Sequence, residues 1–538
     1  MNIAHRIFET AKRLPDKKSV VFSQKQSDGT YHYPFYTFQQ FEERSNQFAH
    51  KLTQAGIKPG MRTLLFVKPC LDFSLITFAL FKIGAIPVLI DPGMGIKNLL
   101  ASIKQVKPEA MVSIGLVHWI RRFKPAAFKS IRVKVSLHRA GFKTQYLYEK
   151  LEKAEKFFDI HPALDSDQAA ILFTSGGTGL PKGVIYTHGI LNAQTEALQK
   201  MFSLDETQSD LPGFPLFALF TLAMGMTSVV PDMDPTKPAK CDPKKLIRNI
   251  QDNNITFVAG SPSIWEKVGK YCLAHKIQLP SIKQVVMFGA PVRSEIHQMY
   301  KKILINGDTY TPYGATECLP VSLISGSQIL NGKADQTNAG AGTCIGRAIA
   351  GIEIKIIKAT DIPETCLQEM PLTEIGEIAV SGLQVTPGYF EMPEENQKAK
   401  IQQEGKLWHR MGDVGHMDHE QNLWFLGRKI HRIKVDDATT HYSIRIEAIF
   451  NQHPEIKRTA LIQILKQGRI TPALAIERLD GQTSLSQKFE TELRVLSQSS
   501  EHTRMIHDFF LHPSFPVDVR HNIKIDRSKL SKWATQRG

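Results

Sequence analysis

A glycine-rich loop with one lysine follows a short apolar run in the segment AAILFTSGGTGLPKGV. Glycine tolerates the positive φ angles of a tight loop, so successive backbone N–H groups can turn toward one anion. The nearby hydroxyl groups and one ammonium group add further donors. A surface turn would explain the glycines, but it would explain neither the apolar run before the loop nor the PKGV segment after it. The sequence therefore predicts a phosphate-binding loop, formed by Thr174, Ser175, Gly176, Gly177, Thr178, Gly179 and Lys182.

Further motifs follow this loop along the chain. The loop is not of the Walker A type, in which Gly-Lys is followed by Ser or Thr, because here the lysine precedes a glycine. It instead resembles the phosphate loop of the adenylate-forming superfamily, which includes acyl-CoA ligases, luciferases and the adenylation domains of peptide synthetases. The other matching motifs are MFGAPV (287–292), YTPYGATEC (310–318), MGDVGHMD (411–418), LGRKIHRIKV (426–435) and RHNIKIDRSKL (520–530). Because they keep the family's order and cover nearly the whole chain, the chain is identified as a member of this superfamily.

The resemblance implies that ATP and a carboxylic acid react to give an acyl-adenylate and pyrophosphate. Both reactants are anionic, so the main catalytic task is to neutralise and position charge. Glu317 is implied as the ligand of Mg²⁺, which prefers hard oxygen ligands, and Thr316 as a donor to the α-phosphate. The residues implied to bind adenine and ribose are Gly289, Ala290, Pro291, Tyr313, Gly314, Asp413 and Arg428.

Three of these residues have side chains suited to a nucleoside. Tyr313 offers a flat face to adenine, and Arg428 would add a contact to the ribose or a phosphate. Asp413 can accept hydrogen bonds from both ribose hydroxyls, although a structural Asp that caps a turn is the alternative interpretation. The nucleotide site is therefore expected to combine residues from several motifs.

Lys524 is the expected catalytic residue, together with Glu317 and Thr316. A lysine in a basic tail is ordinarily a solvated charge, and only the surrounding motif IKIDR indicates a catalytic role for it. A long side chain with a point charge suits the bridging of the carboxylate and the α-phosphate as negative charge builds up. The resemblance implies that a small C-terminal domain swings this lysine in for adenylation and away afterwards, like a lid.

The chain departs from the pattern of acyl-CoA ligases where the thiol of coenzyme A would enter. Ile430 stands where those enzymes usually have a hinge Asp, and Ala218 stands where many thioester-forming members have a histidine. The stretch VDDATTHYSIRIEAIF replaces a glycine-containing loop, and a backbone with β-carbons cannot approach a ligand as closely as glycine can. These departures indicate that coenzyme A is not used.

The β-lactone synthetases of bacterial olefin biosynthesis share these departures, and the chain resembles them in LWFLGRKIHRI, EAIFNQHPEIKRTALI and VDVRHNIKIDRSKLSKWA. The resemblance implies adenylation of a long-chain 2-alkyl-3-hydroxy fatty acid, followed by attack of its own hydroxyl on the acyl carbonyl. Intramolecular attack needs no thiol and gains a large effective concentration. ATP and Mg²⁺ are then the only cofactors. The alternatives are a long-chain fatty-acid–CoA ligase, acyl transfer to a carrier protein, and an inactive nucleotide-binding protein.

Alternating strand and helix patterns must position these motifs. RTLLFVK, DFSLITFALFKIG and AIPVLID read as strand, helix and strand, and the segments 254–276 and 282–303 repeat the scheme. This alternation predicts an α/β fold with layered, largely parallel sheets. Short strands between turns predict a β-rich subdomain over 342–424. We expect a large N-terminal AMP-binding domain over 1–427 and a small, mobile α+β C-terminal domain over 428–538.

Composition limits the cellular setting. The 538 residues hold six scattered cysteines without metal-ligand spacing, which predicts a reducing, cytoplasmic compartment and no zinc site. The N-terminus reads as an amphipathic helix and not as a secretory signal. The apolar runs Phe73–Ile90 and Phe214–Val230 are interrupted by charge, Gly or Pro, so we expect core or pocket walls and no membrane span. The sequence does not indicate an oligomeric state.

The net charge of +15 is unevenly distributed. No acidic residue occurs over 110–148, and aromatic residues alternate with basic ones there. The basic residues are Arg121, Arg122, Lys124, Lys129, Arg132, Lys134, Arg139 and Lys143, and the aromatic ones Trp119, Phe123, Phe128 and Phe142. Such a segment is compatible with peripheral association at an anionic membrane, here the inner face, and also with an ordinary solvated face. No motif for nucleic-acid binding occurs, so a nucleic-acid partner is not expected.

Overall fold

The strand and helix patterns fold into two mostly parallel sheets in a computed structural model of the chain, which describes residues 1–68, 70–138, 144–174, 181–436, 439–517 and 525–537. The first sheet has nine strands in the order β19-β17-β16-β15-β14-β12-β13-β1-β4. Its central pairs are parallel, and antiparallel strands close both edges. Its strands are β1 (Lys18–Phe22), β4 (Phe35–Thr37), β12 (Ser209–Pro212), β13 (Thr227–Val230), β14 (Phe257–Gly260), β15 (Gln284–Met287), β16 (Asp308–Ala315), β17 (Cys318–Ser325) and β19 (Arg347–Ala348).

The second sheet has seven strands in the order β11-β10-β6-β5-β7-β8-β9. All of its pairs are parallel except β10 with β11, the two strands that flank the glycine-rich loop. Its strands are β5 (Arg62–Phe66), β6 (Ile86–Ile90), β7 (Ala110–Ser113), β8 (Val133–Ser136), β9 (Gln145–Tyr146), β10 (Gln168–Thr174) and β11 (Lys182–Thr187). The phosphate-loop motif is therefore anchored by an antiparallel pair at a sheet edge.

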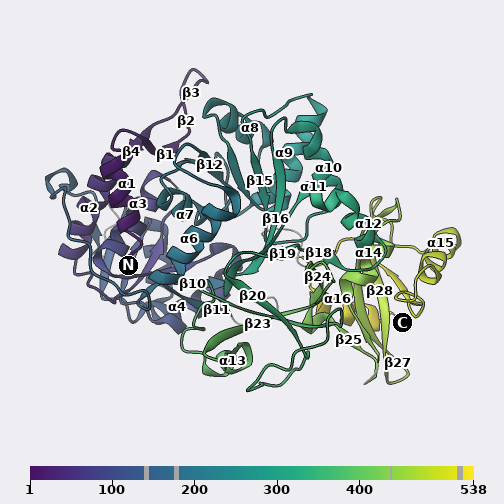
Figure 1. Cartoon of the computed structure of the whole chain (residues 1–538). Coiled ribbons are helices and arrows are strands. Elements are labelled where there is room, and N and C mark those ends of the chain that lie inside the picture. Colours follow the sequence, from purple (N-terminus) through teal and green to yellow (C-terminus); the bar gives the residue numbers. More distant parts are fainter. Residues whose placement is uncertain (69, 139–143, 175–180, 437–438, 518–524, 538) are drawn as a thin grey trace.

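Helices cover both sheets (Figure 1). One core cluster contains residues of both sheets and of the helices between them. The helix α3 is buried from Phe73 to Ile83 and packs on β6 of one sheet and β1 of the other, which confirms the expected core role of this apolar run. The one charged residue of this stretch is Lys82, whose Nζ lies 2.7 Å from Oε1 of Glu42. The helices up to α12 are α1 (His5–Arg13), α2 (Phe38–Gln54), α3 (Leu71–Ile83), α4 (Ile96–Val106), α5 (Gly115–Phe123), α6 (His188–Phe202), α7 (Phe217–Ala223), α8 (Pro243–Asp252), α9 (Pro262–Ala274), α10 (Ser294–Ile303), α11 (Gly326–Gln328) and α12 (Ala334–Asn338).

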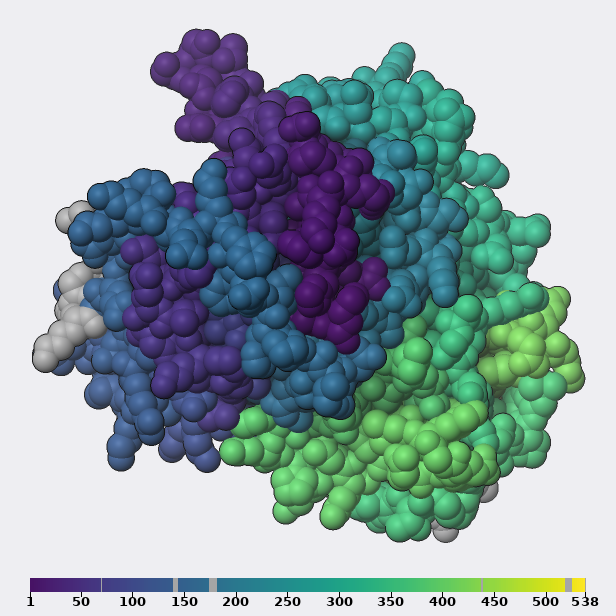
Figure 2. All heavy atoms as spheres, turned by 60° about the vertical axis from the view of Figure 1, so that its left-hand side comes forward, coloured from purple at the N-terminus to yellow at the C-terminus, as the bar shows by residue number. Residues whose placement is uncertain are grey.

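A third, antiparallel sheet forms the predicted β-rich subdomain, with the order β18-β24-β23-β21-β20 and β22 paired to β23. Its strands are β18 (Thr343–Cys344), β20 (Ile352–Ile357), β21 (Gly376–Gly382), β22 (Lys400–Gln403), β23 (Lys406–Met417) and β24 (Leu423–Arg428). The helix α13 (Pro393–Ala399) lies beside it (Figure 1). A small hairpin of β2 (Gln24–Lys25) and β3 (Tyr31–His32) projects from the opposite part of the molecule (Figures 1 and 2).

The C-terminal part has its own core, which begins at Ile433 and packs the β27–β28–β29 sheet against helices. Its elements are β25 (Ile433–Lys434), β26 (Thr440–His441), α14 (Ser443–Phe450), β27 (Ile456–Lys466), β28 (Arg469–Arg478), α15 (Gln487–Gln498), β29 (Phe509–Leu511) and α16 (Arg527–Thr535). The chain thus has a large N-terminal domain and a smaller C-terminal one, as expected. Over the described residues, no helix is long and apolar enough to cross a membrane.

Candidate active site

Parallel neighbours β15 and β16 bring two of the predicted motifs to the same sheet edge. Gly289 to Pro291 follow β15, and Tyr313 lies near the end of β16, so both segments leave the sheet at carboxyl ends. Ligands of open α/β sheets bind at such edges. A β-carbon on Gly314 would lie 2.8 Å from the carbonyl oxygen of Cys318, so only glycine fits in this tight hairpin.

Asp413 links the first sheet to the β-rich sheet. The hydroxyl of Tyr313 donates to its Oδ2 at 2.6 Å, and Nη1 of Arg428 lies 3.0 Å from its Oδ1. Asp413 and Arg428 are direct partners in the β23–β24 pairing. Burial raises the pKa of Asp413, whose side chain is 5% exposed, while the guanidinium opposes that rise. In turn, the Asp413 carboxylate raises the pKa of Arg428.

Glu317 lies in the turn between β16 and β17, and several segments hold that turn. The hydroxyl of Tyr389 donates to Glu317 Oε1 at 2.7 Å. The backbone N–H and the hydroxyl of Thr386 donate to the Glu317 carbonyl oxygen at 2.9 and 3.0 Å. The hydroxyl of Tyr186 on β11 donates to the carbonyl oxygen of Thr316 at 2.7 Å. Thr316 and Glu317 are therefore fixed relative to the strand that follows the phosphate loop.

Lys182 at the start of β11 joins the same group of residues. Its ammonium is paired with Glu395 on α13 and lies 4.8 Å from the centre of the Tyr389 ring. The segment around Tyr389 pairs with β11 through an isolated bridge to Val184. One tyrosine therefore connects the lysine of the phosphate-loop motif to the predicted magnesium ligand.

A second lysine, Lys400, approaches this turn from β22. Its Nζ donates to the carbonyl oxygen of Thr386 at 2.5 Å. Burial lowers the pKa of Lys400 to about 8, although the charge of Glu317 acts in the opposite direction. Thr386 thus contacts both the ammonium group of Lys400 and the backbone of Glu317, the predicted magnesium ligand.

Five of the predicted site residues that the structure describes fall into two linked groups. Tyr313, Asp413 and Arg428 are directly linked, and Glu317 is linked to Lys182 through Tyr389. Ser175, Gly176, Gly177, Thr178, Gly179 and Lys524 lie outside the described residues, as does the side chain of Thr174.

Arg527, a described residue of the C-terminal motif, acts on the same histidine as Arg428. Burial, together with the positive charges of Arg527 and Arg428, lowers the pKa of His431 to about 4. Arg527 is itself held by Glu447 at 2.7 Å. The end of the C-terminal motif and the Arg428 end of the nucleotide group therefore share one electrostatic environment.

Sequence reasoning missed the supporting residues Tyr186, Thr386, Tyr389, Glu395 and Lys400. Two of them occur in GYFEMPEE, where an aromatic residue after glycine precedes Pro and acidic residues at a helix start. That pattern predicts the start of α13, because Pro and acidic side chains favour the first helical turn. It does not reveal which distant residues the side chains contact.

The residues present fit magnesium bound together with a nucleotide. Over the described part of the chain, no three His, Cys, Asp or Glu side chains cluster as a metal site would require. Proteins commonly hold Mg²⁺ through one or two carboxylates plus substrate phosphates, without a cage of protein ligands. Glu317, oriented by Tyr389 beside the strand that carries Lys182, is the donor such a site needs.

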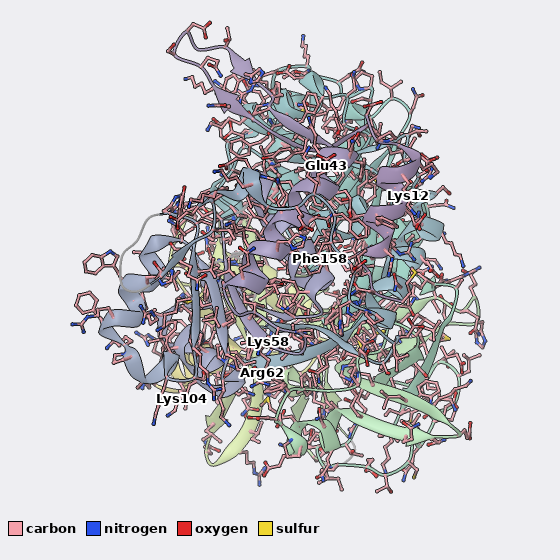
Figure 3. The ribbon with its side chains drawn as sticks, turned by 90° about the vertical axis from the view of Figure 1, so that its left-hand side faces the viewer. Lys12, Glu43, Lys58, Arg62, Lys104 and Phe158 are labelled. Atoms are coloured by element: carbon pink, nitrogen blue, oxygen red, sulfur yellow. The ribbon has the colours of Figure 1, made fainter. Side chains whose placement is uncertain are left out.

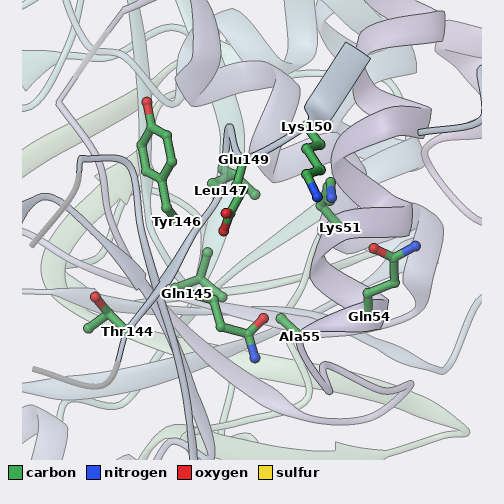
Figure 4. A pocket seen from close by; sticks show the side chains of 10 residues that line it. Lys51, Gln54, Ala55, Thr144, Gln145, Tyr146, Leu147, Glu149 and Lys150 are labelled. Atoms are coloured by element: carbon green, nitrogen blue, oxygen red, sulfur yellow. The ribbon is translucent and has the colours of Figure 1, made fainter. Parts of the chain in front are cut away.

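A separate surface pocket of about 490 Å³ lies between α2 and the segment 144–150 (Figure 4). Its lining includes Lys51, Gln54 and Tyr146, and it contains none of the described site residues. It lies beside β8 and β9 at one edge of the second sheet, so we do not assign the nucleotide to it.

Comparison with known proteins agrees with the geometry. The AMP-binding enzyme family matches residues 7–390. An olefin beta-lactone synthetase of Stenotrophomonas maltophilia is 37% identical over 99% of this chain and 98% of its own length. A protein of the same name from Xanthomonas campestris pv. campestris is 39% identical over 93% of this chain and 91% of its own.

Solved structures show the same fold at lower identity. The amide bond synthetase McbA of Marinactinospora thermotolerans has a TM-score of 0.79 at 20% identity, over 99% of this chain and all of its own. ATP-bound MatB of Rhodopseudomonas palustris also has a TM-score of 0.79, at 18% identity, over 100% of this chain and 99% of its own. The family match covers more than two thirds of the chain, and two relatives match it nearly end to end. The chain is therefore a member of the AMP-binding enzyme family.

Proposed function

We propose that this enzyme uses ATP and Mg²⁺ to convert a long-chain 2-alkyl-3-hydroxy fatty acid into a β-lactone. The observation that carries the proposal is the similarity to two olefin beta-lactone synthetases over nearly the whole chain. The linked carboxylate, tyrosine and arginine groups at the sheet edge support a nucleotide site there.

In the first step, an oxygen of the acid's carboxylate attacks the α-phosphorus of ATP, and the bond to the leaving pyrophosphate breaks. Asp413 accepts hydrogen bonds from the ribose hydroxyls, and Tyr313 lies against adenine. Thr316 and the loop residues 174–179, with Lys182, donate to the phosphates. Glu317 would hold Mg²⁺, which would supply positive charge against the phosphates. Placing fixed donors where charge builds up lowers the barrier without reorganising solvent.

In the second step, the 3-hydroxyl oxygen attacks the activated carbonyl carbon. The bond between that carbon and the oxygen carried by AMP breaks, a proton is released, and a four-membered lactone ring forms. No external nucleophile is consumed. Because attacking and attacked atoms belong to one molecule, the site has only to hold the substrate in a reactive conformation.

Lys524 carries the positive charge between the carboxylate and the α-phosphate in this proposal, on a C-terminal domain that acts as a lid. We place the domain boundary between residues 427 and 428, at the end of β24. Separate cores on the two sides, one beginning at Ile433, support this division. The charges of Arg527 and Arg428 both act on His431, which supports the arrival of this motif at the site.

We propose that coenzyme A is not a substrate. The described part of the stretch that replaces the glycine loop contains β26, which pairs with β25 in a hairpin, and then α14, and Val435 N–H donates to the Thr439 carbonyl oxygen at 3.0 Å. A hairpin with side chains leaves less room for a pantetheine chain than a glycine loop does. Ala218 on α7 supplies no group that could activate a thiol.

The test is product analysis by mass spectrometry, with ATP, Mg²⁺ and a 2-alkyl-3-hydroxy acid, with and without coenzyme A. The proposal predicts that lactone and AMP form in both reactions, and that coenzyme A does not change the rate of their formation. The matched acid without the 3-hydroxyl should support exchange of pyrophosphate into ATP but give no lactone. A thioester that forms only when coenzyme A is supplied would favour the fatty-acid–CoA ligase. If no acid supports exchange, the chain is an inactive nucleotide-binding protein.

We also propose a cytoplasmic location with peripheral contact to the inner face of the membrane. All six cysteines are free thiols, and four of them are buried, as is usual in a reducing compartment. Fractionation of cells by centrifugation tests the location, which would be wrong if the protein were found outside the cytoplasmic and inner-membrane fractions.

A further inference from the structure

One face of α5 exposes a stripe of large apolar side chains. Leu116 is 65% exposed, Trp119 52% and Phe123 72%. Spacings of three and four residues place them on the same helix face. The other face is buried, because Val117 belongs to a core cluster with α4 and the short helix at 125–128. The Trp119 and Phe123 rings stack at 6.2 Å, so they form one apolar surface.

The structure divides three aromatic residues of the basic segment into two groups, while Phe142 lies outside the described residues. Phe128 is only 4% exposed and packs in the core, whereas Trp119 and Phe123 face outward. The sequence could not separate them, since all are flanked by basic residues. Trp119 and Phe123 are the two that present exposed ring surface.

Exposed basic residues lie within α5 and in the segment directly after it, and we call them the basic rim. Arg122 lies within the helix, and Lys124, Lys129 and Arg132 follow it, all exposed. No acidic residue occurs between positions 110 and 148. On the neighbouring α4, Lys104 adds another charge at the edge of the same side of the molecule (Figure 3). An apolar stripe with a basic rim complements a surface with an apolar interior and anionic headgroups.

We propose that α5 is the docking helix of this enzyme for anionic lipid bilayers. Leu116, Trp119 and Phe123 enter the headgroup–acyl boundary, and the basic rim contacts lipid phosphates. A specific protein interface uses about 20–30 residues a side, far more than this stripe supplies. An interfacial helix needs only a short apolar face and a charged rim. The docking does not depend on the lactone chemistry.

The test is sedimentation of the full-length protein with vesicles of phosphatidylcholine, alone or mixed with phosphatidylglycerol. Wild-type protein should bind the mixed vesicles, less so at high salt, and the neutral ones weakly. The double variant Trp119→Ser/Phe123→Ser should lose binding by about tenfold or more, because two membrane anchors are removed. Arg122→Glu/Lys124→Glu should lose at least about tenfold, since each basic residue near the surface contributes to attraction.

Matched control variants change equally exposed residues elsewhere. Leu465→Ser/Val495→Ser alters side chains that are 62% and 65% exposed in the C-terminal domain, and Lys301→Glu/Lys302→Glu alters charges on α10. Both controls should bind like wild type. Circular dichroism and pyrophosphate exchange with a micelle-free, short-chain acid check that each variant is folded.

Two outcomes would overturn the proposal. One is equal binding of wild type and both α5 variants to anionic vesicles. The other is that the wild-type protein does not bind vesicles but self-associates in light scattering, and that Trp119→Ser/Phe123→Ser abolishes this self-association. The second result would assign the stripe to a protein contact.

Discussion

Replacing Asp413 by Asn removes one charge at the junction of two sheets and preserves the size of the side chain. In the wild type, the carboxylate accepts from Tyr313 at 2.6 Å and lies 3.0 Å from Arg428. The neutral amide no longer balances the guanidinium, and its NH₂ group must face one of these two donors. Hydrogen bonds to charged groups contribute about 1.5–3 kcal/mol, and a tenfold change corresponds to about 1.4 kcal/mol.

We therefore expect the KM for ATP of Asp413→Asn to rise by roughly 10- to 100-fold, since the ribose loses a charged acceptor. Tyr313→Phe is the matched variant, because it removes the same hydrogen bond but leaves the carboxylate and the aromatic ring. It should raise KM by about two- to tenfold. The assay is ATP–pyrophosphate exchange at varied ATP, with thermal unfolding to confirm that each variant is folded.

A KM for ATP within twofold of wild type in folded Asp413→Asn would refute this reasoning. Asp413 would then be a structural residue that joins β23 to β16, the alternative that its sequence context leaves open. An equal increase in both variants would assign the effect to the Tyr313–Asp413 bond instead of to the ribose contact.

Three more predictions concern other parts of the molecule. Lys524→Ala should abolish pyrophosphate exchange and leave ATP binding, followed by calorimetry, within a few-fold of wild type; normal turnover would remove Lys524 from catalysis. Tyr389→Phe frees the Glu317 carboxylate, so the Mg²⁺ concentration for half-maximal exchange should rise about three- to tenfold, and an unchanged Mg²⁺ requirement would contradict this positioning role. Burial raises the pKa of Asp210 to about 8, with Thr221 donating to it at 2.8 Å, so the native state holds this proton and loses stability as pH rises toward 8. The test is urea unfolding of Asp210→Asn and wild type at about pH 5 and about pH 8. The free energy of unfolding of the variant minus that of wild type should be larger at the higher pH by on the order of 3–4 kcal/mol. A difference that does not change with pH would show that the native carboxyl is already ionised.

Local patterns were enough to predict much of the fold. The apolar run of α3, the following strand β6, and the strand–helix pairs β14–α9 and β15–α10 were expected from periodicity and are confirmed. Such segments are readable because burial of one continuous face dominates their conformation. The β-rich sheet was also expected, from short strands between Gly and Pro turns.

The support of the candidate site was not predictable, because its contacts join distant parts of the chain. Tyr389 and Glu317 are 72 positions apart, and Lys182 and Glu395 are 213 apart. Neither spacing carries a signal in a single sequence, and each residue type is common on surfaces. Exposure on α5 is likewise a property of packing, since Phe128 is buried and Phe123 is not.

The most direct test of the central claim uses a 2-alkyl-3-hydroxy acid whose carboxylate oxygens are oxygen-18. If the carboxylate attacks the α-phosphorus of ATP and the 3-hydroxyl closes the ring, AMP must leave with one labelled oxygen, and the lactone carbonyl must keep the other. Mass spectrometry of AMP and lactone from one turnover should show both. Unlabelled AMP, or label in inorganic phosphate together with ADP, would contradict the account.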